Sequence, residues 1–484
     1  MKTAVVAALA SLGAAAAAPK PANEPFHGRY RISPVDGTKI ALPTKEQLAF
    51  QDREIGFLIH FNIATYIQED GCNSNQSLVP ERKLFDPELL NTDQWMESAK
   101  DLGAKYATLV AKHNCGFTTW PSKVQFSDRD GNAMTYNYTV AQSPVSGKDV
   151  IRSFVDSTKK YSLGHGFYYS SVVNNYLNVY GSEARKEPLA PGQVGVTTET
   201  YNKVVIDQLT ELWGQYGDLT EIWFDGGYSG AQKASIEKLL EEKQSKAVIF
   251  NGCDTKGVCL SDKPIRWIGN EMGNAGDDNW STGVGEDSGD PGSPFFAPAE
   301  CDTSLQTQDR WFWGVKQPLR SLKEMVGVYH SSVGRNCVLA LDLAPDRNGL
   351  VPADAAARYK ELGDFIRSCY DDEEPSKYVD SSIDGQYLMT FDKPTTIDRI
   401  VMMEDQTNGQ LIRSYNVYAK IIDSDGINHS KDVPWTRVSG GKSIGHKRID
   451  LFDAPVTVTD VMINSTYVDV PEFRSVSVHL CERF

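Results

Sequence analysis

A single aspartate closes an apolar run in the segment Glu221-Ile222-Trp223-Phe224-Asp225-Gly226-Gly227. The apolar residues are typical of a buried strand, and an unpaired carboxylate buried beside them would cost free energy. In α/β barrels, however, reactive side chains lie at the carboxyl ends of the strands and point into one pocket. The two glycines permit a sharp turn that leaves room for a ligand. The segment therefore indicates either a carboxylate that acts on a substrate or an Asp that caps the next loop.

Polar and aromatic side chains follow other predicted strands as well. One apolar run ends at His60, a second leads into His113 and Asn114, a third contains Tyr168, and a later stretch contains Glu271. In a sugar pocket, His and Asn side chains bind hydroxyl groups, whereas Trp and Tyr rings cover the C–H faces. A single His on an apolar strand is usually a hydrogen-bonded core residue. A whole series of such strand ends is harder to explain by packing and favours a sugar pocket.

Two members of this series, Asp225 and Glu271, are carboxylates of the kind that glycoside hydrolysis requires. One carboxylate must be ionised in order to attack the anomeric carbon. The other must hold a proton near the working pH, so that it can protonate the departing oxygen. The sequence also offers Glu286, in an acidic glycine-rich loop, and Glu300 as rival acids. For Glu286 the alternative is a solvated loop, and for Glu300 it is a buried pair with Arg310 or Arg335.

A repeated β-then-α pattern between about residues 55 and 369 must position these side chains. We expect strands at residues 55–61, 106–111, 166–170, 222–225, 247–250, 265–268 and 338–342. Helices are expected at residues 92–102, 149–161, 200–216 and 353–368. Units of this length predict an α/β fold with a parallel sheet, most economically a TIM-type (β/α)8-like barrel. Because only about seven strands are clear, the pattern fits an irregular barrel as well as a regular one.

The sequence pattern changes at the acidic segment Asp371-Asp372-Glu373-Glu374-Pro375. We therefore expect a barrel domain over residues 19–372 and a second domain over residues 373–484. Short alternating segments in the second domain predict an antiparallel β-sandwich, with strands at residues 387–391, 397–403, 413–421, 447–451, 456–463 and 476–480. Its expected role is packing against the barrel, and carbohydrate binding is the alternative.

Composition and the first residues indicate which partners the protein can have and where in the cell it is sent. The formal net charge of −15 makes nucleic acid and anionic membrane surfaces poor partners and favours a neutral substrate. Residues 1–18 combine Lys2, an apolar stretch and an alanine run, and therefore predict a signal peptide and a secreted protein. Eight cysteines would then meet an oxidising compartment, and Cys253 and Cys259 are the plausible pair. Sequons occur at Asn75, Asn137, Asn279, Asn428 and Asn464.

Several of these segments together resemble the α-L-fucosidases of glycoside hydrolase family twenty-nine. The motifs that carry the resemblance are Phe57-Leu58-Ile59-His60-Phe61, Ala111-Lys112-His113-Asn114-Cys115-Gly116-Phe117-Thr118-Thr119-Trp120-Pro121-Ser122, Trp223-Phe224-Asp225-Gly226, Trp267-Ile268-Gly269-Asn270-Glu271, Pro298-Ala299-Glu300-Cys301-Asp302 and Ser331-Ser332-Val333-Gly334-Arg335-Asn336-Cys337. They follow one another in order over about residues 53–346. The segment from Gly440 to Lys447 extends the resemblance to the subgroup that prefers fucose on α-1,3 and α-1,4 branches.

The resemblance implies a double displacement with net retention. Asp225 would be the nucleophile, and Glu271 would be the general acid and then the general base. Matching positions imply that the fucose pocket is lined by His60, Glu69, His113, Trp120, Tyr168 and Trp223. Asn114 stands where the family usually has a second histidine. Its amide can bind a hydroxyl group but cannot titrate.

The combined expectation is a secreted, retaining exo-α-L-fucosidase that acts on a fucosylated glycan without a metal or other cofactor. The histidines are too scattered for an obvious metal-ligand set. One alternative is a fucose-binding, lectin-like protein on an inactive barrel, which would need the loss of one carboxylate. A barrel hydrolase of another sugar is the second alternative, because fold analogy alone does not exclude it.

Overall fold

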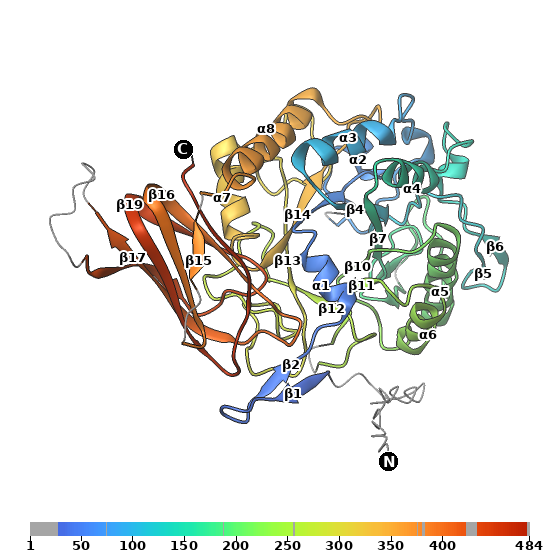
Figure 1. Ribbon diagram of the computed structural model, residues 1–484. Coiled ribbons are helices and arrows are strands. Elements are labelled where there is room, and N and C mark those ends of the chain that lie inside the picture. Colours follow the sequence, from blue (N-terminus) through green and yellow to red (C-terminus); the bar gives the residue numbers. More distant parts are fainter. Residues whose placement is uncertain are drawn as a thin grey trace, which may run out of the picture.

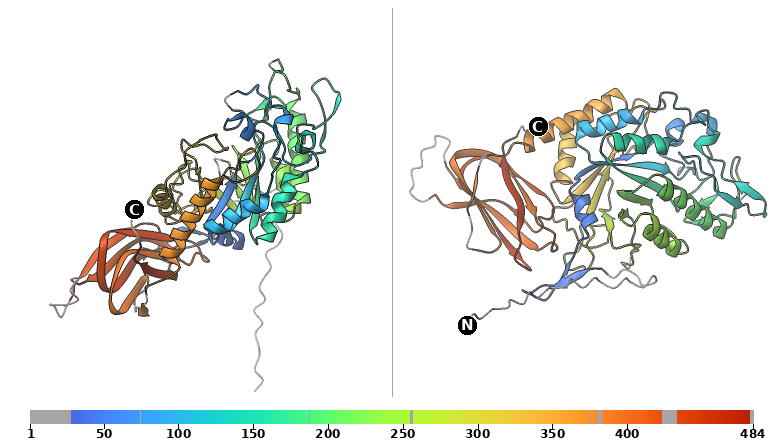
Figure 2. Two further views of the ribbon diagram at one scale, coloured as in Figure 1. Left: turned by 90° about the horizontal axis from the view of Figure 1, so that it is seen from above. Right: turned by 45° about the vertical axis from the view of Figure 1, so that its right-hand side comes forward.

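The computed structural model describes residues 28–73, 75–186, 188–254, 257–374, 376–379, 383–422 and 433–481. The predicted signal peptide, residues 1–18, and the sequon at Asn428 lie outside these residues. Figure 1 shows a barrel wrapped by helices, with an antiparallel sheet structure beside it. In both views of Figure 2 the C-terminal strands gather at one end of an elongated molecule.

The barrel consists of eight parallel strands that close in the order β10-β11-β12-β13-β14-β3-β4-β7. In chain order these strands are β3 (Ile55–Ile59), β4 (Tyr106–Lys112), β7 (Gly164–Ser170), β10 (Glu221–Asp225), β11 (Val248–Phe250), β12 (Pro264–Trp267), β13 (Ala299–Thr303) and β14 (Cys337–Leu343). The predicted fold class is confirmed. The seven predicted barrel strands are all present, with shifts of a few residues at their ends.

The eighth strand, β13, was not predicted from the sequence. Its residues Ala299-Glu300-Cys301-Asp302-Thr303 include two carboxylates, yet all five are buried. The described residues between β11 and β13 contain no helix, so the barrel is irregular in this sector. A long loop over residues 268–298 replaces the missing helix and occupies the carboxyl-end side of β12.

The helices are α1 (Lys45–Gln51), α2 (Ala64–Ile67), α3 (Thr92–Leu102), α4 (Val150–Lys160), α5 (Thr198–Gln215), α6 (Lys233–Lys243), α7 (Leu322–Ser331) and α8 (Ala353–Tyr370). Local signals explain the predicted ones. Asn91 accepts backbone N–H groups at the start of α3, and Gly103 ends it in the left-handed conformation. Asp149 caps α4 in the same way. Helices α1, α2, α6 and α7 were not predicted from the sequence. The smaller elements are η1 (Arg82–Leu84), η2 (Val140–Gln142) and the antiparallel pairs β1 (Tyr30–Ile32)–β2 (Lys39–Ala41), β5 (Gln125–Ser127)–β6 (Ala133–Thr135) and β8 (Val179–Tyr180)–β9 (Glu183–Ala184).

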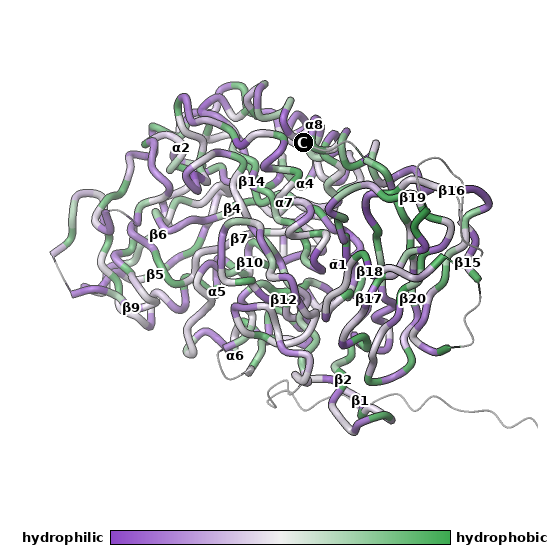
Figure 3. Tube along the Cα trace, turned by 90° about the vertical axis from the view of Figure 1, so that its left-hand side faces the viewer, coloured by the Kyte–Doolittle hydropathy of each residue, from purple (hydrophilic) through white to green (hydrophobic). Residues whose placement is uncertain are grey.

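The C-terminal part is an antiparallel sheet of six strands in which two strands are long. Its strands are β15 (Lys377–Val379), β16 (Gln386–Glu404), β17 (Ile412–Ile421), β18 (Trp435–Gly441), β19 (Arg448–Tyr467) and β20 (Phe473–His479). β16 and β19 each join two predicted strands into one, with register shifts where the prediction placed a break. Their apolar side chains enclose a separate core, and Figure 3 shows hydrophobic segments along these strands.

The sheet structure is attached to the barrel by covalent and polar contacts. A disulfide joins Cys369 at the end of α8 to Cys481 beyond β20. The Ser443 hydroxyl donates to the backbone carbonyl of Asn279, 2.5 Å away. Asn279 is 1% exposed and its side-chain amide donates to the carbonyls of residues 335 and 336, so the sequon there is not a surface glycosylation site. By contrast, Asn75, Asn137 and Asn464 are exposed.

All eight cysteines are paired. The pairing of Cys253 with Cys259 is confirmed, and the others join Cys72 to Cys115, Cys301 to Cys337 and Cys369 to Cys481. Among the described residues, no helix combines the length and apolar character needed to cross a bilayer.

Candidate active site

Asp225 lies at the carboxyl end of β10 and is half-buried. Tyr168 of the neighbouring strand β7 donates its hydroxyl to Oδ2 of Asp225 over 2.5 Å. The parallel register pairs Trp223 with Tyr168, and Trp223 stands two residues before Asp225 on β10. Both aromatic rings therefore lie on the same face of the strands as Asp225. The Asp225 carboxylate therefore accepts a side-chain hydrogen bond at the carboxyl end of the barrel strands.

A stack of rings runs across the interior of the barrel beneath Asp225. His113 is stacked on Tyr168 with ring centroids 5.5 Å apart, and Tyr168 is stacked on Trp223 at 4.9 Å. Trp223 is stacked in turn on Phe250 at 4.1 Å. The sequence-predicted residues His113, Tyr168 and Trp223 are thus brought together with Asp225. Phe250 completes the stack and was not predicted as a site residue.

His60 forms the opposite wall of this group. It is 4% exposed, and its Nδ1 lies 2.9 Å from Oδ1 of Asp342 near the carboxyl end of β14. Its ring contacts those of His113 at 6.2 Å and Tyr168 at 6.0 Å. Burial lowers the pKa of His60 well below its usual range, and burial raises the pKa of Asp342 well above its own. His60 is therefore a neutral, buried imidazole that Asp342 orients beside His113 and Tyr168.

Lys112 supplies a cation close to Asp225. Its ammonium group is buried, donates to the backbone carbonyl of Ser170 and lies 4.5 Å from the centroid of the Tyr169 ring. Burial lowers the pKa of Lys112 to about 7, and the Asp225 charge opposes this shift. Burial likewise lowers the pKa of His113, again against the Asp225 charge. Lys112 and His113 therefore both lie close enough to Asp225 to interact with its charge.

Asn114 is buried beside His113 and holds a loop in place. Its Oδ1 accepts the backbone N–H of Cys72 over 2.7 Å, and Cys72 is disulfide-bonded to Cys115. A Cβ atom at Gly71 would lie 2.6 Å from the His113 ring, so the glycine permits this close approach. The side-chain oxygen of Asn114 thus orders the loop that follows α2, next to the pocket where the prediction placed the residue.

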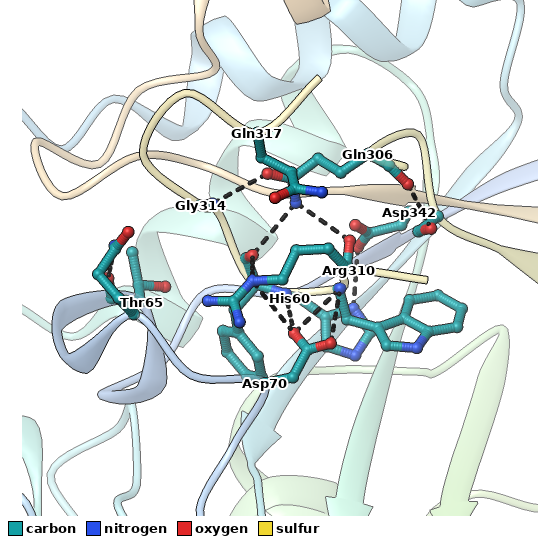
Figure 4. Close-up of polar contacts among 12 residues, drawn as sticks. His60, Thr65, Asp70, Gln306, Arg310, Gly314, Gln317 and Asp342 are labelled. Atoms are coloured by element: carbon teal, nitrogen blue, oxygen red, sulfur yellow. Dashed lines mark hydrogen bonds and ion pairs between the residues drawn. The ribbon is translucent and has the colours of Figure 1, made fainter. Parts of the chain in front are cut away.

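The loop after α2 binds a second loop through Asp70, as Figure 4 shows. Asp70 accepts the backbone N–H groups of Trp311 and Phe312 at 3.0 and 2.8 Å, and its carboxylate lies 3.7 Å from Nε of Arg310. Inside the second loop, the Gln306 amide donates to the carbonyls of Arg310 and Phe312. Asp70 and Gln306 together fix residues 306–314, which were not predicted as part of the site.

That second loop brings two aromatic rings into the pocket. Phe312 contacts His60 edge-on at 5.2 Å and His113 at 5.1 Å. Trp311 lies 5.0 Å from the His60 ring and donates its indole N–H to Oε2 of Glu271 over 3.2 Å. The same loop therefore connects the His60 wall with the second predicted carboxylate.

Glu271 is exposed on the loop after β12, yet its surroundings disfavour its charge. Partial desolvation raises its pKa, and the Trp311 hydrogen bond opposes this shift. The carboxylates of Asp309, Asp225 and Asp70 raise the pKa further. Glu271 therefore lies within electrostatic range of Asp225 and favours its protonated form more than an isolated glutamate does.

The rival carboxylates have different surroundings. Glu286 is exposed, and its backbone carbonyl packs against Gly269. Glu300 is fully buried and accepts from Trp223 and Tyr106, so the expected pairing with Arg310 or Arg335 is wrong. Arg335 pairs with Asp277 instead.

Two predicted pocket residues do not join the group. Glu69 is exposed, whereas its neighbour Asp70 faces the site. Trp120 is 1% exposed and donates its indole N–H to Glu211 near the carboxyl end of α5. The indole of Trp120 is thus held by α5. Its role in binding the sugar stays a prediction.

Comparisons with known proteins agree with this geometry. A family model described as alpha-L-fucosidase matches residues 73–369. Over 460 residues the chain is 26% identical to alpha-L-fucosidase 1 of Arabidopsis thaliana, an alignment that covers 85% of this chain and 81% of that protein. It is 27% identical to a putative alpha-L-fucosidase 1 of Oryza sativa subsp. japonica over 86% of this chain and 80% of that one. A crystal structure of a putative alpha-L-fucosidase from Bacteroides thetaiotaomicron superposes with a TM-score of 0.78 at 27% identity, covering 91% of this chain and 99% of that one.

Proposed function

Since this chain belongs to the alpha-L-fucosidase family of glycoside hydrolases, we propose that it is a retaining exo-enzyme in which Asp225 is the nucleophile and Glu271 the acid/base. One observation carries the assignment. A half-buried strand-end carboxylate receives the Tyr168 hydroxyl above a stack of aromatic rings, and a second carboxylate lies within range of its charge. Retaining hydrolysis uses two carboxyl groups in these roles.

In the first step, Glu271 donates its proton to the glycosidic oxygen while Asp225 attacks the anomeric carbon. The C–O bond to the leaving group breaks, and a fucosyl ester on Asp225 forms. In the second step, Glu271 takes a proton from water, the water oxygen attacks the same carbon, and the ester bond to Asp225 breaks. The raised pKa of Glu271 suits the first role, because a carboxyl must still hold its proton in order to give it away.

The remaining pocket residues bind and orient the sugar in this proposal. Trp223 and Tyr168 present ring faces to C–H groups, while His60 and His113 bind hydroxyl groups. Asp342 fixes the orientation of His60, and Asn114 fixes the loop that carries Asp70. Lys112 lies near Asp225 and donates to the backbone carbonyl of Ser170 at the end of β7.

Among the three candidate acids, contacts favour Glu271. It has the indole of Trp311 beside it and feels the charge of Asp225. Glu300 already uses both carboxylate oxygens inside the barrel. Glu286 is exposed on the following part of the loop. The subgroup resemblance around Gly269-Asn270-Glu271 supports the same choice and an α-1,3 or α-1,4 branch as substrate. The alanine-rich start and the four disulfides support secretion.

The stereochemical course tests the proposed mechanism. We expect proton NMR of a reaction on an aryl α-L-fucoside to show the α-anomer of free fucose first, with the β-anomer appearing later by mutarotation. Initial release of the β-anomer would contradict a double displacement. An α-1,4-fucosylated oligosaccharide compared with an α-1,2-linked one then tests the linkage. Equal rates on both would overturn the branch preference and leave the fucosidase assignment intact.

Replacement of Asp70 by Asn should lower kcat/KM about 10- to 100-fold. The amide lacks the charge that attracts Arg310 and has a single oxygen for the backbone N–H groups of Trp311 and Phe312. Trp311 would then lose its fixed approach to Glu271. The matched control is Glu69→Gln, one residue earlier and exposed, for which we expect a change of less than about twofold. Equal effects of the two substitutions would show that Asp70 does not position the loop.

A further inference from the structure

Two glutamates meet inside the barrel, beneath the aromatic stack and apart from the proposed catalytic pair. Glu221 opens β10 and is 1% exposed, and Glu300 lies on β13 and is 0% exposed. Burial raises the pKa of both, and the interaction between the two carboxyl groups lowers the pKa of Glu221 and raises that of Glu300 further. Buried carboxylates are rarely tolerated without partners, so the contacts around this pair must explain its presence.

Glu300 is fully occupied by two donors. Its Oε1 accepts the indole N–H of Trp223 over 2.9 Å, and its Oε2 accepts the hydroxyl of Tyr106 over 3.0 Å. Only one of the two carboxylate oxygens of Glu221 accepts a hydrogen bond from a described donor. Its Oε2 accepts the Thr108 hydroxyl over 2.5 Å, whereas its Oε1 is buried without a hydrogen-bond partner among the described residues.

Two glycines make room for this arrangement. A Cβ atom at Gly56 on β3 would lie 2.2 Å from the Tyr106 ring. At Gly166 on β7 it would lie 2.6 Å from both the Thr108 hydroxyl and the Glu221 carbonyl. Since no side chain fits at either position, the barrel interior is built to hold the polar cluster rather than filled by apolar residues as is usual.

The charges that face the pair favour a single proton on it. Arg53, before β3, attracts the charge of Glu221, and Asp302 on β13 repels a charge on Glu300. Burial raises the pKa of Tyr106 well above its usual range, so its hydroxyl remains a donor. Burial also raises the pKa values of both glutamates, and each would repel the other if both were ionised.

We propose that Glu221 and Glu300 share one proton and that Glu300 is a positioning residue, which fixes the Trp223 indole as the platform for the sugar. The shared proton supplies the partner that Oε1 of Glu221 lacks. Glu300 carries this proton, so the remaining negative charge stays on Glu221, the member that Arg53 attracts. Both oxygens of Glu300 still accept from Trp223 and Tyr106. The inference rests on the proposed role of Trp223 in the pocket, and it adds a buried acid pair that takes no part in bond cleavage.

Substitutions at Glu300 test the positioning role. Glu300→Leu removes the acceptor for Trp223, and we expect kcat/KM on an aryl α-L-fucoside to fall about 100-fold with weaker L-fucose binding in calorimetry. Glu300→Gln retains an acceptor oxygen and can donate to Glu221, so it should lose less than about 10-fold. A folded Glu300→Leu enzyme with wild-type affinity for fucose would overturn the positioning role.

The pH dependence of unfolding tests the shared proton even if Glu300→Leu does not fold. Carboxyl pKa values raised by folding stabilise the protein fully below the unfolded value, and this contribution is lost as the pH rises through the folded values. Glu221→Gln removes one ionisable group from the pair. Between pH 5 and pH 9 the Tm of Glu221→Gln should therefore fall less than the Tm of the wild type. The difference between the two falls should be about 2 °C or more. Parallel curves would overturn the shared proton.

These readouts separate the inference from the proposed function. If Glu300→Leu keeps wild-type affinity for fucose while turnover still depends on Asp225, the positioning role of Glu300 is rejected and the nucleophile is retained. Turnover that persists in Asp225→Asn, together with a low-activity Glu300→Leu, would reject the nucleophile and retain the acid pair.

Discussion

Asp225→Asn is expected to lower kcat/KM by about 10⁴-fold or more, with little change in Tm. The amide keeps the shape of the carboxylate and can still accept from Tyr168, but it lacks the negative charge that attacks the anomeric carbon. The loss should appear in kcat rather than in KM, because the ring stack and the histidines that hold the sugar are unchanged. Initial rates on an aryl α-L-fucoside measure this effect.

A matched exposed residue and an added nucleophile sharpen the Asp225 experiment. Asp218→Asn, an exposed aspartate paired with Lys246 at the other end of the barrel, should keep wild-type kinetics. In Asp225→Gly, sodium azide can occupy the space of the missing carboxylate and attack from the same face. The product should then be β-L-fucosyl azide, with inverted configuration. Near-normal turnover by Asp225→Asn would show that another residue is the nucleophile.

The barrel was predictable because its strands carry the expected hydrophobic pattern. Each of the seven predicted strands is an apolar run, as in the buried segment Ile55–Ile59. Strand β13 lacks that pattern, since Glu300 and Asp302 are buried acids whose partners come from other strands, Trp223 from β10 across the barrel and Trp267 from the neighbouring β12. Such pairing across strands is a tertiary property and leaves no periodic signal in the local sequence.

The strand ends of the site were predictable for the same reason, whereas its loops were not. Asp225, His60, His113 and Tyr168 follow or end apolar strands, so their meeting at one mouth follows from the parallel topology. Asp70 lies in a loop, where the choice between it and Glu69 depends on backbone N–H groups more than two hundred residues away along the chain.

Trp120 shows a contact that its motif did not predict. The motif that contains it continues past the mouth, and a backbone contact between Thr119 and Ala111 turns the chain back along β4. Proximity in sequence to His113 does not by itself place Trp120 beside the His113 ring. The indole of Trp120 donates to Glu211 on α5, a bond that the motif alone did not indicate. Whether Trp120 also contacts the sugar stays a prediction.

Glu271→Gln should lower kcat/KM on a fucosylated oligosaccharide by about 10²- to 10⁴-fold, because its amide cannot protonate the departing sugar oxygen. The loss should be much smaller on an aryl fucoside whose phenolate leaves without a proton. Glu286→Gln, a conservative change on the same long loop, should keep near-normal rates on both substrates. If Glu286→Gln instead loses the oligosaccharide activity and Glu271→Gln retains it, the acid belongs to the later part of the loop.

Two further results would tie Glu271 to both steps of the mechanism. In Glu271→Gln, azide should restore turnover of the aryl fucoside by displacing Asp225 from the fucosyl ester, which gives α-L-fucosyl azide with the configuration of the substrate. In Trp311→Phe, loss of the indole hydrogen bond removes an interaction that lowers the pKa of Glu271. The acid form then persists to higher pH, so the alkaline limb of kcat/KM should move upward. A downward shift would mean that Trp311 acts on a different group, because a hydrogen bond to a carboxylate stabilises its ionised form and its removal raises the pKa.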